Sequence, residues 1–245
     1  MRKVTNWAHR GASGHATENT LSAFKMAVQM GADGIECDLR ETCDGHFVIF
    51  HDATLKRMAN QPDAIAHCSL DQLQQVNLGH RGRRKGEPLP ALSQLFKNVN
   101  PPCLLNLEIK KGTPEKLLDQ VYQHHAQERV LLSSFDGLLL SRIRSLDSHI
   151  AIGYLLDQRV TTDILKEARK MKARSLHLDV RQVTEKGIRR LQTEGFQVYA
   201  YTVNDLAQMT QLIGMGIDGL FTNYPDRLTR LLSGSKSLMK ERGSC

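Results

Sequence analysis

Short apolar runs rich in β-branched residues alternate with amphipathic stretches along most of the chain. This rhythm is typical of strand and helix units that build a parallel sheet. Amphipathic stretches such as 19–30 and 184–192 predict helices. We interpret the apolar runs as eight strands, at residues 4–9, 34–40, 103–109, 130–134, 150–155, 175–180, 197–203 and 218–222. Eight units in 245 residues predict an α/β fold of the (β/α)8 TIM barrel type, because such barrels often contain about 250 residues.

A doubly wound open sheet is the structural alternative. Such sheets often carry a glycine-rich dinucleotide fingerprint directly after their first strand, and this chain has none there. We therefore favour the closed barrel.

One segment departs from the rhythm. Between the second and third parallel strands lie residues 41–102, of which only 92–99 matches the expected crossover helix. We interpret about 41–90 as an insertion subdomain that contains a hairpin, irregular loops and a short helix near 70–76. Insertions of this length are usually functional or disordered. The prediction is one barrel domain over 1–232, with this insertion, and a flexible tail over 233–245.

Composition narrows the class of protein. With 40% hydrophobic residues, the chain has more apolar side chains than disordered chains or disulfide-rich mini-proteins usually have. The five cysteines are odd in number and lack C-x-x-C spacing, which favours a reducing compartment. No apolar run has the length of a secretion signal or a membrane span. We expect a soluble cytoplasmic protein without stable membrane insertion.

The net charge of +7 favours anionic partners. Nucleic acid is one candidate, but only 5% of residues are aromatic and the basic residues are scattered. The exception is a basic cluster at Arg81, Arg83, Arg84 and Lys85, which we interpret as a solvated loop. We expect no nucleic-acid partner.

Acidic residues stand where a barrel places its active site, at the carboxyl ends of the strands. Glu36 and Asp38 are two residues apart in the second strand and therefore share a face, and Glu108 lies near the end of the third. A single acid there would most simply form a structural salt bridge. Three converging acids would repel one another unless a cation or bound protons compensated them, and a hard divalent ion is the natural answer. Oxygen ligands alone favour Mg²⁺ or Ca²⁺ over zinc.

Two histidines are expected at the same end of the barrel. His9 ends the first strand. Asp44 and Gly45 have the composition of a two-residue hairpin turn, and a turn centred on them would place His51 opposite Asp38 and on its face. A slip of one residue would turn His51 away. Histidine titrates near neutrality, so this pair favours acid–base chemistry.

Several ordered blocks resemble the signature of the glycerophosphodiester phosphodiesterase family. The resemblance spans nearly the whole chain, and the order of the blocks makes it specific. The matching blocks are His9-Arg10-Gly11-Ala12-Ser13-Gly14, Glu18-Asn19-Thr20, Ala23-Phe24, Gly31 to Leu39, Thr42, Asp44-Gly45, Val48, His51-Asp52, Leu107-Glu108-Ile109-Lys110, Ser133-Ser134-Phe135, Tyr201-Thr202-Val203-Asn204 and Asp218-Gly219.

The resemblance implies hydrolysis of a small-molecule glycerophosphodiester to sn-glycerol 3-phosphate and an alcohol. By that resemblance Glu36, Asp38 and Glu108 bind a divalent metal, His9 and His51 form the acid–base pair, and Arg10, Lys110 and Tyr201 contact the substrate. Three positions depart from the family pattern: Thr17 stands in place of the usual Pro, Tyr201 in place of a Trp, and Asn223 in place of an Asp. The change at Asn223 removes one charge at the rim of the site. We assign His9 as base and His51 as acid.

Other functions remain open at this point. A lipid-directed phosphodiesterase, resembling lysophospholipase D or phospholipase C, would share the barrel and the histidines. A barrel that only binds a phosphorylated metabolite would have no use for two histidines beside a metal, and an aldolase or isomerase would not need His51. The nucleophile, either water or the glycerol 2-hydroxyl of the substrate, does not follow from the residues.

Overall fold

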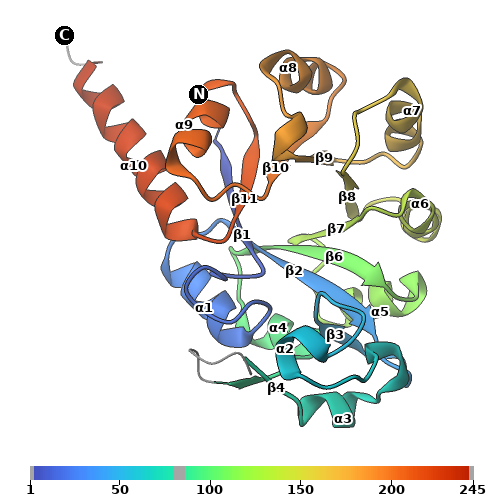
Figure 1. Cartoon of the computed structure of the whole chain (residues 1–245). Helices are drawn as coiled ribbons and strands as arrows, with labels where there is room; N and C mark the ends of the chain where they lie inside the picture. The colour runs from blue at the N-terminus through green and yellow to red at the C-terminus, as the bar shows by residue number, and fades with distance from the viewer. Residues whose placement is uncertain (1–2, 80–85, 243–245) are drawn as a thin grey trace.

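Eight parallel strands close into a barrel in the computed structural model, which describes residues 3–79 and 86–242, the last eight by their backbone alone (Figure 1). Neighbouring strands follow the order β1, β11, β10, β9, β8, β7, β6, β2, and β1 also pairs with β2, which closes the ring. The (β/α)8 TIM barrel is thereby confirmed. The barrel strands are β1 (Thr5–His9), β2 (Gly34–Glu41), β6 (Leu104–Lys111), β7 (Val130–Ser134), β8 (Ala151–Leu156), β9 (Ser175–Asp179), β10 (Gln197–Tyr201) and β11 (Gly219–Thr222).

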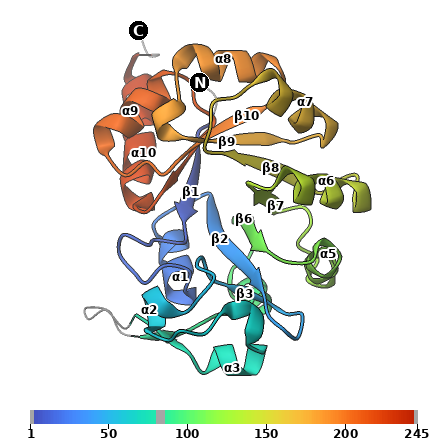
Figure 2. The same ribbon diagram turned by 45° about the vertical axis from the view of Figure 1, so that its right-hand side comes forward.

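Helices cover the outside of the barrel (Figure 2). The outer helices are α1 (Leu21–Gln29), α4 (Leu92–Asn98), α5 (Pro114–Gln123), α6 (Gly137–Leu146), α7 (Thr162–Lys170), α8 (Glu185–Thr193), α9 (Leu206–Gly214) and α10 (Pro225–Arg242). Polar side chains cap the first turns of several of these helices. Thr20 accepts a hydrogen bond from the Ala23 amide at the start of α1, and Asp136 accepts from two amides at the start of α6. Side chains at such positions satisfy amides that lack a partner within the helix.

The last helix, α10, extends into the segment predicted to be a flexible tail. Residues 243–245 lie outside the described part of the chain, so the flexibility of the tail stays a prediction. Among the described residues, no helix is both long enough and apolar enough to cross a membrane.

The strand alternation divides the side chains between two cores. Along β2, Ile35, Cys37 and Leu39 point outward into the large cluster under the helices, which leaves Glu36 and Asp38 for the barrel interior. Deeper inside the barrel an aromatic cluster contains Trp7, Leu131, Tyr199 and Phe221. The carboxylates therefore lie on the inner face of the barrel, while the aliphatic side chains of β2 pack under the helices.

The insertion after β2 has a core of its own, away from the barrel axis (Figure 1). Its helix α3 matches the predicted short helix, while the subdomain boundary at 41–90 stays a prediction. The basic cluster, Arg81, Arg83, Arg84 and Lys85, lies outside the described residues. The elements are β3 (Phe47–Ile49), α2 (Lys56–Ala59), η1 (Ile65–His67), α3 (Leu70–Gln74), β4 (Asn77–Leu78) and β5 (Glu87–Pro88). The insertion core contains Val48, Phe50, Leu55, Ile65, Leu73, Val76, Leu78 and Leu89.

The predicted hairpin register was wrong by one residue. Strand β3 is antiparallel to β2 with Leu39 opposite Ile49, and the Phe50 amide donates to the Asp38 carbonyl at 2.8 Å. The turn is longer than two residues, because the Thr42 amide bonds the His46 carbonyl across it, with Gly45 in the left-handed region at φ 84°. Phe50, not His51, stands opposite Asp38.

Candidate active site

Three carboxylates converge at the carboxyl ends of β2 and β6. The register places Asp38 beside Glu108, and Glu36 precedes Asp38 on the same face. One oxygen from each of the three side chains lies within 4.8 Å of the others. All three are buried, with exposed fractions of 6% or less. The periodicity of two in the sequence predicted this convergence correctly.

This carboxylate cluster has the electrostatics of a cation site. Burial and the neighbouring carboxylates raise the pKa of Glu36 and of Glu108. Burial acts in the same sense on Asp38, but Arg10 and Lys110 outweigh it and lower the pKa of Asp38. Glu36 Oε1 is buried without a hydrogen-bond partner among the described residues. A hard divalent cation fits this all-oxygen donor set and would relieve both the repulsion and the unpaired oxygen.

Two cationic side chains border the carboxylates. Arg10 Nε lies 3.2 Å from Asp38 Oδ2, and the Arg10 amide donates to Glu36 Oε2 at 2.8 Å. Lys110 Nζ lies 3.3 Å from Asp38 Oδ1 and also contacts Glu108. Arg10 has φ 55° in the turn directly after β1, which aims its backbone amide at Glu36. Positive charge thus stands beside the acidic cluster, where an anionic group could approach.

His9 ends β1 and is held by one side chain. Its Nδ1 lies 2.7 Å from Asn223 Oδ1, and its Nε2 lies 4.0 Å from Glu36 Oε2. Burial, with the charge of Arg10, lowers the pKa of His9 to about 4. If Nδ1 donates to Asn223, Nε2 is the nitrogen that can accept a proton.

His51 reaches the same place by a different route from the predicted one. Pairing between β2 and β3 ends near Phe50, so strand alternation no longer governs the next side chain. Arg40 Nε donates to the His51 carbonyl at 2.8 Å, and His51 Nδ1 lies 2.7 Å from Asp52 Oδ1. Partial burial lowers the pKa of His51, while Asp38 and Asp52 oppose that shift.

A cavity of about 270 Å³ joins these groups. Seven of the eight predicted site residues line it, and the eighth, Asp38, is buried in contact with lining residues Arg10 and Lys110. Tyr201 forms part of the wall with Phe135, edge to face at 6.0 Å between ring centroids. The lining residues are His9, Arg10, Glu36, His51, Asn106, Glu108, Lys110, Phe135, Leu155, Tyr201, Thr202 and Phe221.

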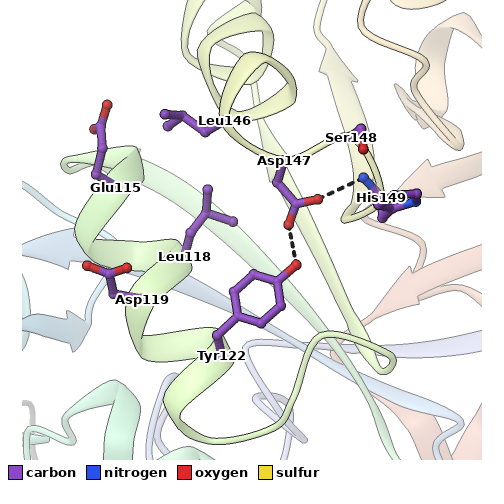
Figure 3. Close-up of a pocket in the computed structure, with 8 residues that line it drawn as sticks. All are labelled: Glu115, Leu118, Asp119, Tyr122, Leu146, Asp147, Ser148 and His149. Atoms are coloured by element: carbon purple, nitrogen blue, oxygen red, sulfur yellow. Dashed lines mark hydrogen bonds between the residues drawn. The ribbon is translucent and has the colours of Figure 1, made fainter.

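A second cavity, of about 450 Å³, lies on the outer surface between α5 and the end of α6 (Figure 3). Tyr122 donates its hydroxyl hydrogen to Asp147 at 2.5 Å, and the His149 amide donates to the same carboxylate. These bonds tie α5 to the connection before β8. None of the predicted site residues lines this cavity, so we place the chemistry at the barrel mouth.

Five further residues, which were not assigned a role from sequence, contact the predicted ones either directly or, for Arg57, through Asp52 and Glu18. Asn19 Nδ2 donates to Asp38 Oδ2 at 2.8 Å. Asn223 contacts His9, so the replacement of the usual Asp changes a neighbour of His9 as well as the charge at the rim of the site. Four of the five lie within or next to the matching sequence blocks, which was the available signal; Arg57 had none. The five are Glu18, Asn19, Asp52, Arg57 and Asn223.

Comparison with known proteins agrees with this geometry. Residues 9–227 match the model of the glycerophosphoryl diester phosphodiesterase family. The chain belongs to this family. It is 33% identical to a glycerophosphodiester phosphodiesterase of Caldanaerobacter subterraneus subsp. tengcongensis, over 92% of this chain and 96% of that protein.

Solved structures of the family share the barrel. An Oleispira antarctica phosphodiesterase, solved in complex with the product sn-glycerol-3-phosphate, superposes with a TM-score of 0.86 at 27% identity, covering 95% of this chain and 97% of that one. The glycerophosphodiester phosphodiesterase of Thermotoga maritima superposes with a TM-score of 0.80 at 26% identity, covering 94% of this chain and 100% of that one.

Proposed function

We propose that this protein hydrolyses glycerophosphodiesters to sn-glycerol 3-phosphate and an alcohol, in the cytoplasm, with a divalent cation, Mg²⁺ or Ca²⁺, bound by Glu36, Asp38 and Glu108. The observation that carries the proposal is one cavity lined by two histidines, two cationic side chains and buried carboxylates at the carboxyl ends of the barrel strands. Membership of the family and the product-bound Oleispira relative support the same substrate class.

The first task of the site is to stabilise the negative charge of the phosphate. Glu36, Asp38 and Glu108 would hold the cation, which would supply positive charge beside the phosphodiester. Arg10 and Lys110 stand beside the same carboxylates and would bind the nonbridging oxygens of the phosphate as their negative charge grows in the transition state. Because these side chains are already held by ion pairs, little reorganisation accompanies the reaction.

The two histidines divide the proton transfers. In this proposal His9 is the base: Nδ1 is bound by Asn223, and its low pKa keeps Nε2 free to take the proton of the attacking hydroxyl. His51 is the acid: Asp52 on Nδ1 stabilises the imidazolium, and Nε2 delivers a proton to the leaving alkoxide. Each histidine thus has one nitrogen anchored and the other available for chemistry.

The test is a panel of glycerophosphodiesters, each assayed with Mg²⁺, Ca²⁺ and Mn²⁺ for release of glycerol 3-phosphate. We expect cation-dependent release that a chelator abolishes. Full activity after dialysis against the chelator would remove the cation from the proposal, and absence of glycerol 3-phosphate from every reaction would contradict the substrate class.

A lipid-directed phosphodiesterase is the second candidate, because apolar side chains stand exposed near the mouth. Phe135 is 42% exposed and lines the cavity, and Leu138, at the start of α6, is 84% exposed. Exposed apolar groups of this kind could contact an acyl chain. Comparing glycerophosphocholine with lysophosphatidylcholine separates the two, and a preference for the lipid would overturn our substrate assignment.

A further inference from the structure

The guanidinium of Arg57 joins two parts of the candidate site without lining its cavity. Arg57 Nε donates to Asp52 Oδ2 at 2.7 Å and Nη2 donates to Asp52 Oδ1 at 3.1 Å, so it grips both oxygens of that carboxylate. Nη2 also donates to Glu18 Oε1 at 2.6 Å. The same Glu18 oxygen accepts from Arg10 Nη1 at 3.0 Å. One side chain therefore contacts the carboxylate behind His51 and the carboxylate behind Arg10.

We propose that Arg57 is a positioning residue for the hydrolysis: it fixes the plane of the Asp52 carboxylate, and thereby the ring of His51, in the orientation that protonates the leaving alcohol. This inference rests on the proposed function. Arg57 acts through Asp52 and has no contact with the cavity itself.

Asp52 alone would hold His51 weakly. The imidazole of His51 is one-third exposed, and its only hydrogen bond among the described residues is the one from Nδ1 to Asp52. A single ion pair at such exposure restrains the orientation of the imidazole ring only weakly. Holding two side chains in one geometry costs entropy, and water competes for the hydrogen bond. The two-bond fork from Arg57 fixes the carboxylate plane as well as its position. Partial burial would raise the pKa of Asp52, but Arg57 and His51 outweigh it and lower that pKa to about 2.

The position of Arg57 depends in turn on the insertion. Helix α2 has only four residues, and the flanking Leu55 is buried in the insertion core, against which Met58 also packs. Short helices of this length are stabilised mainly by packing. The insertion core thus places Arg57, Arg57 holds Asp52, and Asp52 holds His51. This chain of contacts gives the insertion a function in the reaction.

The leaving group provides the test. An alkoxide leaves only with a proton, whereas p-nitrophenolate is stable as an anion and leaves without one. The experiment compares kcat of wild type, Arg57→Met, Arg57→Lys and the control Lys56→Met. The two substrates are glycerophosphocholine and the p-nitrophenyl ester of glycerol 3-phosphate. Lys56 is the exposed neighbour on the same helix and makes none of the contacts described here.

For Arg57→Met we expect kcat on glycerophosphocholine to fall on the order of tenfold to a hundredfold, as for other residues that orient a functional histidine. On the p-nitrophenyl ester it should fall less than about twofold. Arg57→Lys keeps the charge but not the fork and should lie between wild type and Arg57→Met. Lys56→Met should match wild type on both substrates. Equal losses of Arg57→Met on both substrates, or no loss on either, would overturn the proposal.

A measurement without substrate keeps this inference separate from the proposed function. In wild type and Lys56→Met we expect the His51 Nδ1 proton to give a downfield, exchange-protected nuclear magnetic resonance signal, and in Arg57→Met we expect it to be lost while the melting temperature stays within a few degrees. If that signal persists in Arg57→Met, Arg57 does not position His51. A wild-type enzyme inactive on both esters would instead contradict the proposed function, whatever the signal shows.

Discussion

The candidate site has two halves of different construction. The barrel half contains Glu36, Asp38 and Glu108 on neighbouring strands, buried to 94% or more. The insertion half contains His51, Asp52 and Arg57, whose side chains are 34%, 24% and 41% exposed. Strand ladders hold the first half from both sides, while a short helix and a loop hold the second. In our proposal, therefore, the groups that bind the cation are more firmly held than the segment that delivers the proton.

Removing a carboxylate from the barrel half should have the largest effect. We expect Glu36→Gln to abolish high-affinity Mg²⁺ binding and to lower kcat/KM by about a thousandfold or more, since a bound cation contributes several kcal/mol to such transition states. Calorimetric titration with Mg²⁺ and initial rates measure the two effects. The exposed Glu128→Gln serves as the control. If Glu36→Gln kept its affinity for Mg²⁺, the assignment of Glu36 as a cation ligand would be wrong.

Removing either histidine should lower activity, but the two losses should depend differently on the leaving group. We expect His9→Ala and His51→Ala each to lose about 10² to 10⁴ in kcat on glycerophosphocholine. On the p-nitrophenyl ester only His9→Ala should stay impaired, because only the base is still needed there. Steady-state rates on both esters measure this difference. The reverse pattern would exchange the two roles, and full activity of either variant would end its assignment.

The two cores should respond differently to the same truncation. Leu73→Ala in the insertion core and Leu165→Ala under the barrel helices both remove a buried side chain, at a cost of about 2–5 kcal/mol each. We expect Leu73→Ala to speed hydrogen exchange in residues 47–78 and to lower kcat, and Leu165→Ala to lower the melting temperature without lowering kcat at 25 °C. Equal effects on kcat would contradict the independence of the two halves.

The smallest expected effect is a shift of the pH profile at Asn223. Burial lowers the pKa of His9 to about 4, so we expect the proposed base to be proton-free above that pH and activity to fall below it. In Asn223→Asp a carboxylate would replace the neutral oxygen on Nδ1, which favours the imidazolium and raises the pKa of His9. The acid limb of kcat/KM should therefore move to higher pH. An unmoved limb would show that another group sets it.

The same division separates what could and could not be predicted. Glu36, Asp38 and Glu108 followed from strand periodicity, because side chains two apart share a face and adjacent parallel strands align their ends. His51 was placed at the mouth on a register that proved wrong, and it arrives there because pairing stops at Phe50. Arg57 had no sequence signal, since its partners Glu18 and Asp52 lie 39 and 5 residues away in the chain.

The eight strand and helix units, the faces of the strand acids and the family could all be read from the residues, because they depend on local periodicity and ordered motifs. The hairpin register, the contact of His9 with Asn223 and the link from Arg57 through Asp52 to His51 became visible only in the folded chain. The register and the Arg57 link depend on how a three-residue strand and a four-residue helix pack, in part against the insertion core. The contact of His9 depends on barrel closure, which brings β1 beside β11. No local pattern encodes such packing, because its energy comes from contacts between residues distant in the chain.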